Sequence, residues 1–131
     1  MARHLVIGNG KILVNLDKSC FIRDIYFPFV GQLNHTGGHP CRFGIWCGGK
    51  FSWLDDPSWR IELGYIENSL VTNVSARNEE LGIELHINDG IHQRECIYMK
   101  RVVVRNLTEE PKDVRVFFHQ DLMIDGSEVG D

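Results

Sequence analysis

Apolar and polar residues alternate with a period of two through much of the second half of this sequence. Such alternation turns successive side chains to opposite faces of an extended chain, so it predicts half-buried antiparallel strands. A slip of one residue would turn each apolar set to water, so the register should be firmly specified. Three sets keep one parity: Leu70, Thr72, Val74 and Ala76; Ile83, Leu85 and Ile87; and Val114, Val116, Phe118, Leu122 and Ile124.

The first half also divides into short strands separated by turns. We expect strands at 5–7 and 11–16 around a Gly8-Asn9-Gly10 hairpin turn, then strands at 20–27, 42–47, 50–54 and 59–65. Residues 31–40 form a loop of Gly, Asn, His, Thr and Pro. Further turns are expected at 78–82, 88–90 and 106–113, with a strand at 96–105. Turn signals at this spacing predict an all-β fold, an antiparallel β-sandwich.

Length and charge narrow the function classes. The 131 residues suffice for a single domain, 1–131, with its own core. There are 18 acidic against 14 basic side chains, giving a net charge of −4 with no basic block. We therefore expect no binding to nucleic acid or to an anionic membrane. No apolar run has the length of a membrane span or the form of a signal peptide, so a cytoplasmic location is expected.

The four cysteines are expected to be free thiols, because a domain of this size needs no disulfide. Cys20, Cys47 and Cys96 stand among apolar neighbours, where cysteine behaves as a small core residue. The His and Cys residues of segment 35–47 follow none of the usual zinc spacings, so we predict no metal site. The Gly-Asn-Gly turn lacks the third glycine and the helix of a dinucleotide site, and no cofactor is expected.

Paired carboxylates would be needed for the hydrolysis of a glycosidic bond. The candidate pairs lie in turns, and adjacent residues of a strand point to opposite faces, so they cannot hold one bond between them. The sequence therefore predicts no catalytic residue. The pairs considered are Asp55 with Asp56, Glu79 with Glu80, Glu109 with Glu110, and Asp121 with Asp125.

Trp46, Trp53 and Trp59 lie close together in the sequence. Large aromatic residues usually fill the core or a contact between domains, but their faces also stack on sugar rings. Trp53 and Trp59 bracket an Asp-Asp-Pro turn, so we expect them to be the exposed pair and the candidates for carbohydrate stacking.

Several separated blocks of the sequence resemble one family. They are Gly8-Asn9-Gly10, Ile25-Tyr26-Phe27-Pro28, Gly31 through His35, Phe51-Ser52-Trp53-Leu54, Arg105-Asn106-Leu107 and Phe117-Phe118-His119-Gln120-Asp121. Together they are similar to the N-terminal β-sandwich domain of the prokaryotic and archaeal glucoamylase-type enzymes, family fifteen of the glycoside hydrolases. That family includes glucoamylases, glucodextranases and some trehalases, and the resemblance covers nearly the whole chain.

The resemblance implies a non-catalytic role. In the family, two glutamates of a following helical (α/α)-barrel domain perform an inverting hydrolysis of α-glucosidic bonds, and the sequence contains no such domain. The family's "super β-sandwich" is longer than this chain, which would form part of one. We therefore expect an inactive module of an intracellular α-glucoside hydrolase that supports its catalytic barrel. Starch-, dextran- and trehalose-type substrates all remain open.

The resemblance also implies candidate contact residues. The loop at 31–35 is similar to one near the family's active-site rim, so Asn34, His35 and the nearby His39 are candidates for contact with the barrel or the substrate. The alternative function is a stand-alone carbohydrate-binding module that uses exposed tryptophans. A third expectation is a homodimer through an open sheet edge, because the polar segment 125–131 contains no closing strand.

Overall fold

The computed structural model describes residues 2–124, which form ten strands and no helix. Every strand pairing is antiparallel, so the predicted all-β antiparallel fold is confirmed. The described residues accordingly include no helix long and apolar enough to cross a membrane. The strands are β1 (Leu5–Gly8), β2 (Leu13–Leu16), β3 (Ile22–Tyr26), β4 (Arg42–Cys47), β5 (Lys50–Trp53), β6 (Trp59–Glu62), β7 (Val74–Asn78), β8 (Ile83–Ile91), β9 (Tyr98–Asn106) and β10 (Val114–His119).

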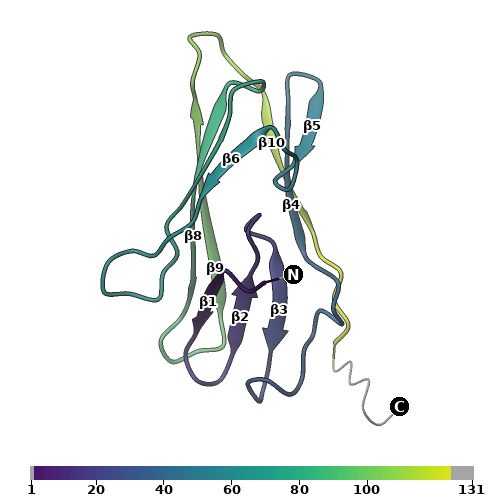
Figure 1. The fold of residues 1–131 in the computed structure, drawn as a ribbon, viewed down its shortest axis with the longest axis vertical. Coiled ribbons are helices and arrows are strands. Elements are labelled where there is room, and N and C mark those ends of the chain that lie inside the picture. Colours follow the sequence, from purple (N-terminus) through teal and green to yellow (C-terminus); the bar gives the residue numbers. More distant parts are fainter. Residues whose placement is uncertain (1, 125–131) are drawn as a thin grey trace.

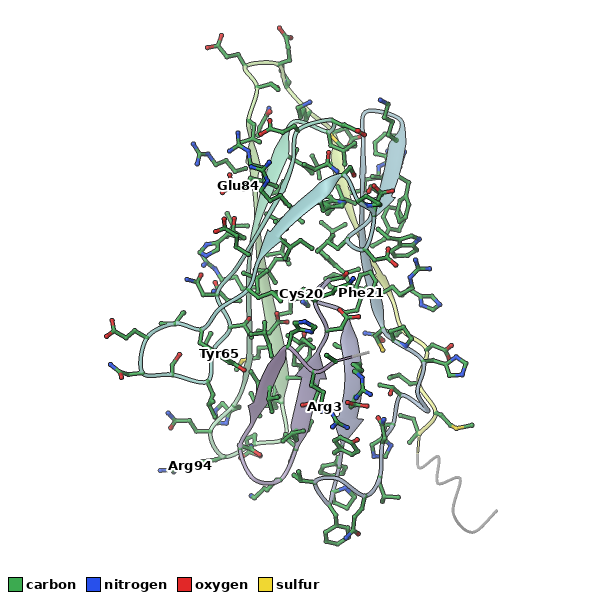
Figure 2. All side chains as sticks on the ribbon, in the orientation of Figure 1. Arg3, Cys20, Phe21, Tyr65, Glu84 and Arg94 are labelled. Carbon is green, nitrogen blue, oxygen red and sulfur yellow. The ribbon has the colours of Figure 1, made fainter. Side chains whose placement is uncertain are left out.

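The strands form three sheets that enclose one core. Their orders are β1-β2-β3, β10-β4-β5 and β6-β7-β8-β9. In Figure 1 the upper part of the four-stranded sheet stands opposite β4, β5 and β10, and β1–β3 lie in the lower half of the picture, beside the lower part of β8 and β9. Side chains fill the space between the sheets, and Figure 2 marks Cys20 and Phe21 near its centre. All three sheets contribute to a single buried apolar cluster, as in a β-sandwich.

The period-two pattern predicts the core correctly in the central strands. Ile83, Leu85 and Ile87 of β8 are fully buried, and so are Val74 and Ala76 of β7, which pairs with β8. β7 and β8 each have a strand on both sides within their sheet, so their inward-facing side chains are not open to solvent at a sheet edge. Alternation is therefore a reliable guide where a strand lies inside its sheet.

The first hairpin forms as expected. The side-chain oxygen of Asn9 accepts hydrogen bonds from the backbone N–H groups of Lys11 (2.9 Å) and Ile12 (3.2 Å). Gly10 has a φ of +90°, which favours glycine. The local chemistry of the turn thus sets the β1–β2 register, in which Leu5 pairs with Leu16.

Two details of the sequence prediction are wrong. Residues 88–90 are not a turn but belong to β8, and residues 70–73 precede β7, where Leu70 is 60% exposed. Thr72 explains both, because its hydroxyl accepts a 2.7 Å hydrogen bond from the backbone N–H of Asp89. Thr72 and Asp89 are hydrogen-bonded to each other inside the fold, and Lys100 and Tyr98 also contact the Asp89 carboxylate, so both residues can occupy buried positions.

The apolar set of β10 is also not buried as expected. Val116 is 37% exposed and Phe118 55%, while Leu122 and Ile124 beyond the strand are more than 40% exposed. Among the described residues, β10 has β4 as its sole strand neighbour and β9 has β8, so both are edge strands. Their inward-facing residues therefore stay open to solvent on one side. Residues 125–131, with Asp125 of one carboxylate pair, lie outside the described residues.

All four cysteines are free, as predicted. Their burial differs from the expectation, since Cys96 is exposed and Cys41 is buried together with Cys20 and Cys47. Cys96 precedes β9 in an exposed segment, where its apolar neighbours Ile97 and Tyr98 do not enclose it.

Candidate functional surfaces

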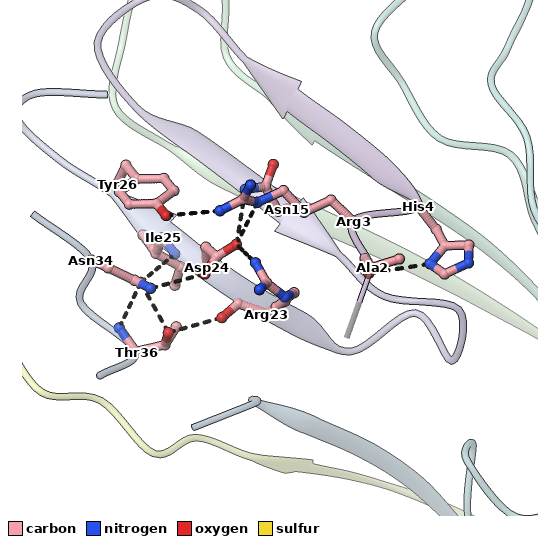
Figure 3. A network of polar contacts seen from close by, with 10 residues as sticks. All are labelled: Ala2, Arg3, His4, Asn15, Arg23, Asp24, Ile25, Tyr26, Asn34 and Thr36. Atoms are coloured by element: carbon pink, nitrogen blue, oxygen red, sulfur yellow. Dashed lines mark hydrogen bonds and ion pairs between the residues drawn. The ribbon is translucent and has the colours of Figure 1, made fainter. Parts of the chain in front are cut away.

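Asn34 anchors the candidate loop from within (Figure 3). Its side-chain oxygen accepts hydrogen bonds from the N–H groups of Ile25 (3.1 Å) and Thr36 (3.2 Å), and its amide donates to Asp24 Oδ1 at 2.9 Å. The amide and oxygen of Asn34 are thus engaged within the chain. The structure places Asn34 as a loop-positioning residue that ties residues 34–36 to β3.

Asp24 is the centre of this network. It is 4% exposed, and its Oδ2 accepts from Asn15 (3.0 Å), Arg3 (3.1 Å) and Arg23 (2.5 Å). Burial alone would raise the pKa of this carboxyl, but the hydrogen bonds from Asn15, Arg3 and Arg23 outweigh it and lower the pKa below its ordinary value. Asp24 is therefore an ionised structural carboxylate.

His35 and His39 turn to different partners. His35 Nε2 lies 2.6 Å from the carbonyl oxygen of Phe27, and its backbone carbonyl accepts from Met123 N–H at 2.8 Å. His39 is exposed, and its Nδ1 lies 3.2 Å from Asp121 Oδ2. Asn34, His35 and His39 thus belong to one loop, but their side chains contact different partners and do not form one site. Of the three, His39 is the one fully on the surface.

Trp53 belongs to an exposed aromatic surface on the outer side of β10-β4-β5. Its members alternate with the buried Phe43, Ile45 and Cys47 of β4, so they face away from the core. Phe51 and Phe117 are 43% and 44% exposed. We call this surface the aromatic face: Arg42, Trp46, Phe51, Trp53, Arg115, Phe117 and His119.

The rings of the aromatic face pack edge to face across Gly44. Phe51 stands at 4.7 Å from Trp53 and 5.5 Å from Phe117, measured between ring centroids. A Cβ at Gly44 would lie 2.6 Å from both Phe51 Cζ and Trp53 Cε3. Only a residue without a side chain lets the rings lie this close to the strand.

Two arginines complete the aromatic face. Arg42 lies over the Trp53 ring at 4.5 Å and Arg115 over the Trp46 ring at 4.8 Å. Each is near a carboxylate, Arg42 at 3.6 Å from Asp55 and Arg115 at 3.3 Å from Asp113. The face therefore combines aromatic area with charges that are balanced locally. Arg115, Phe117 and His119 stand at every second position of the sequence, and this alternation could have indicated the aromatic face.

Trp59 is buried, which corrects the expectation of an exposed pair. It is 7% exposed, belongs to the core cluster, and donates its indole N–H to Ser52 Oγ at 2.9 Å. As the first residue of β6 it faces Asn78 of β7, and the parity of the strand turns it inward. Trp53 is thus the carbohydrate-stacking candidate that reaches the surface.

A second polar network, missed from the sequence, lies inside the sandwich. Asp89 is fully buried and forms a 2.8 Å ion pair with Lys100, whose side chain is 9% exposed. Tyr98 donates its hydroxyl to the same carboxylate, and Thr72 does so at 3.3 Å. In the sequence, Lys100 has the same parity as Val102 and Val104, so it faces inward with them. A buried lysine needs a buried acid as its partner, and this pattern could have indicated the network from the sequence.

This network keeps its neighbours neutral. Burial, and then the Asp89 carboxylate, raise the pKa of the Tyr98 hydroxyl far above its ordinary value. Burial likewise raises the pKa of the Cys20 thiol to about 12, so that thiol is a poor nucleophile. Lys100, Tyr98 and Phe118 line a cavity of about 240 Å³ that opens between β9 and β10.

Three carboxylates of the candidate pairs have structural partners within the chain. Asp55 pairs with Arg42, Asp56 accepts the N–H of Ser58 at 2.9 Å, and Glu79 pairs with Arg77 at 2.6 Å. Within residues 2–124 no group of three His, Cys, Asp or Glu side chains is arranged to hold a metal ion. Asp55, Asp56 and Glu79 thus serve in ion pairs and in a turn.

The chain is thus an antiparallel β-sandwich with a polar network around Asp24, a buried Asp89–Lys100 ion pair and the aromatic face on its outer side. The chain is 23% identical over 119 residues to the "Uncharacterized glycosyl hydrolase MJ1610" of Methanocaldococcus jannaschii. The aligned region covers 91% of this chain and 18% of the relative, so the chain spans less than a fifth of the relative's length. This distant similarity associates the chain with glycoside hydrolases. No family model and no solved structure matches it.

Proposed function

We propose that this chain is the non-catalytic N-terminal β-sandwich of a glucoamylase-type α-glucoside hydrolase and that it packs against a catalytic (α/α) barrel. The aromatic face carries the proposal. It exposes Phe51 and Phe117 beside two tryptophan–arginine stacks, and these residue types dominate the centres of protein interfaces. Its charges are paired within the face, so little uncompensated charge would be buried on docking.

The similarity to a glycosyl hydrolase supports the same proposal. Nearly all of this chain aligns with a small part of that relative, as a supporting module would. Asp55 and Asp56, one of the candidate carboxylate pairs, serve in an ion pair and in a turn. In the proposed arrangement the barrel cleaves the glucosidic bond, and the sandwich stabilises the barrel. The predicted cytoplasmic location and homodimer stay predictions.

The first test is an activity assay. The chain alone is expected to release no glucose from maltose, isomaltose or trehalose above the buffer rate. Release that scales with the concentration of the chain, and persists in preparations from different purifications, would contradict the proposal.

The second test uses the polypeptide encoded by the complete gene. Phe117→Asp should lower its glucosidase activity and its melting temperature, because a charge in a packed interface must be desolvated. The melting temperature of the 131-residue chain should hardly change, because Phe117 is already 44% exposed there. Leu70→Asp, at a 60% exposed position between β6 and β7, is the matched control. Equal effects of the two substitutions would refute docking through the aromatic face.

A stand-alone carbohydrate-binding module is the second candidate. Trp53 favours it, because this half-buried ring reaches the surface beside the polar side chains of Arg42 and His119. Titration with maltoheptaose, followed by tryptophan fluorescence, separates the two functions. Saturable quenching that Trp53→Ala abolishes and Leu70→Asp retains would favour the binding module over the docking surface.

A further inference from the structure

Among residues 2–124, β9 is a long edge strand with no strand beside it on one side. It ends the sheet β6-β7-β8-β9 and pairs with β8 over nine consecutive residues without a register shift. Edge strands are usually protected by shortness, proline, a bulge or charged side chains. β6, at the opposite edge of the same sheet, is only four residues long. β9 is long and has neither a proline nor a bulge, and its protection is positive charge, from Lys100 on the inner side and Arg101 and Arg105 on the outer side. Its free edge is therefore suited to backbone pairing with a strand of opposite charge.

The interior is open beside this edge. Ile83 and Leu85 of β8 are fully buried, but Val104 of β9 is 37% exposed and Phe118 of β10 is 55% exposed. Phe118 also lines a cavity of about 240 Å³, together with Tyr98 and Lys100 at the beginning of β9. An added strand at the β9 edge would turn every second side chain towards this opening.

The outer side of β9 indicates the charge of its partner. Met99, Arg101, Val103 and Arg105 alternate along it, and all four are exposed. In the part of the chain that the structure describes, neither Arg101 nor Arg105 forms an ion pair. A second copy of β9 would place arginine opposite or diagonal to arginine, which is unfavourable. Carboxylates at those places would be favourable.

We infer that the free edge of β9 is an acceptor for one β-strand of a partner polypeptide in which apolar residues alternate with Asp or Glu. The apolar side chains cover Val104 and Phe118, and the carboxylates lie beside Arg101 and Arg105. Backbone hydrogen bonds provide the affinity, and the side-chain alternation provides the register, as in other cases of strand addition. This inference rests on the sheet edge and is independent of the proposed function.

The test uses two synthetic peptides, one alternating valine with glutamate and one alternating valine with lysine. Amide hydrogen exchange of the 131-residue chain, followed by NMR, reports where each peptide binds. The glutamate peptide should slow exchange along β9 and bind about tenfold more tightly than the lysine peptide. The double variant Arg101→Glu and Arg105→Glu should reverse this preference. Arg60→Glu, on the outer side of the β6 edge, should leave it unchanged.

The remaining outcomes decide against the inference. Equal binding of the two peptides, protection at β6 instead of β9, or no protection at all would overturn it. So would a dimer, detected by light scattering without peptide, that protects β9. If the double glutamate variant does not fold, Arg101→Gln with Arg105→Gln provides the same test, and these variants should bind both peptides equally.

Discussion

Replacement of Lys100 by methionine tests the buried network most directly. Methionine preserves most of the apolar stem of lysine but removes the ammonium group, so Asp89 would stay buried without its cation. The carboxylate would keep the hydrogen bonds from Tyr98 and Thr72. The expected loss therefore comes from the uncompensated charge and not from a cavity.

The magnitude follows from the burial of the pair. Removing one member of a buried ion pair destabilises a protein by about 3–5 kcal/mol. Because the Lys100 side chain retains 9% exposure at the cavity mouth, we expect the lower end, about 3 kcal/mol. For a chain of 131 residues this corresponds to a decrease in melting temperature of about 10 °C.

Urea denaturation followed by circular dichroism measures the loss, and a double-mutant cycle assigns its cause. In an Asp89→Asn background there is no carboxylate to leave unpaired, so Lys100→Met should cost less than about 1 kcal/mol. The same loss in both backgrounds would refute the ion-pair explanation. A loss below about 1 kcal/mol in the parent chain would show that the pair is effectively solvated.

Four further predictions concern single residues. Gly44→Ala should destabilise the chain by about 1–3 kcal/mol and change the near-UV circular dichroism, because Phe51 and Trp53 must move. In native protein at pH 8, Ellman's reagent should titrate Cys96 alone, and all four thiols in denaturant; rapid reaction of Cys20 would contradict its burial. Because the folded pKa of Asp24 is lowered, its contribution to stability is present above pH ~4 and is lost in acid. Asp24→Asn should abolish that part of the acid dependence in urea titrations. The folded pKa of Tyr98 is raised, so stability should fall above pH ~10, and Tyr98→Phe should flatten that fall.

The sequence predicts those parts of the fold that local chemistry and two-sided packing determine. The Gly8–Gly10 hairpin follows from one Asx side chain and one glycine, and the β8 core follows from strict alternation. Burial in β9 and β10 depends on whether another strand lies beside them, which no alternation pattern records. Phe118 therefore has the sequence pattern of a core residue and the exposure of a surface residue.

The candidate surfaces were predicted less completely for a related reason. The single residue Trp53 was identified, but the aromatic face depends on β10 pairing with β4, which brings Phe117 beside Phe51 from a distant part of the chain. Asn34 is a rim candidate because residues 31–35 resemble a loop near the active-site rim of the glucoamylase-type family. Its inward direction depends on the buried Asp24 of β3, and a polar loop residue gives no sign of such a partner.

The Asp89–Lys100 pair also supports the register of β9. A shift of β9 by one residue would leave Val103 as the one valine of the three that faces the core, and it would turn Arg101 and Arg105 inward on either side of it. The same shift would turn Lys100 outward and leave Asp89 of β8 buried without its cation, at a cost of about 3 kcal/mol. The polar pair therefore acts together with the apolar pattern to specify which face of β9 lies inward. It fixes at the same time which face of β9 presents Arg101 and Arg105, and so the charge that an added strand must carry.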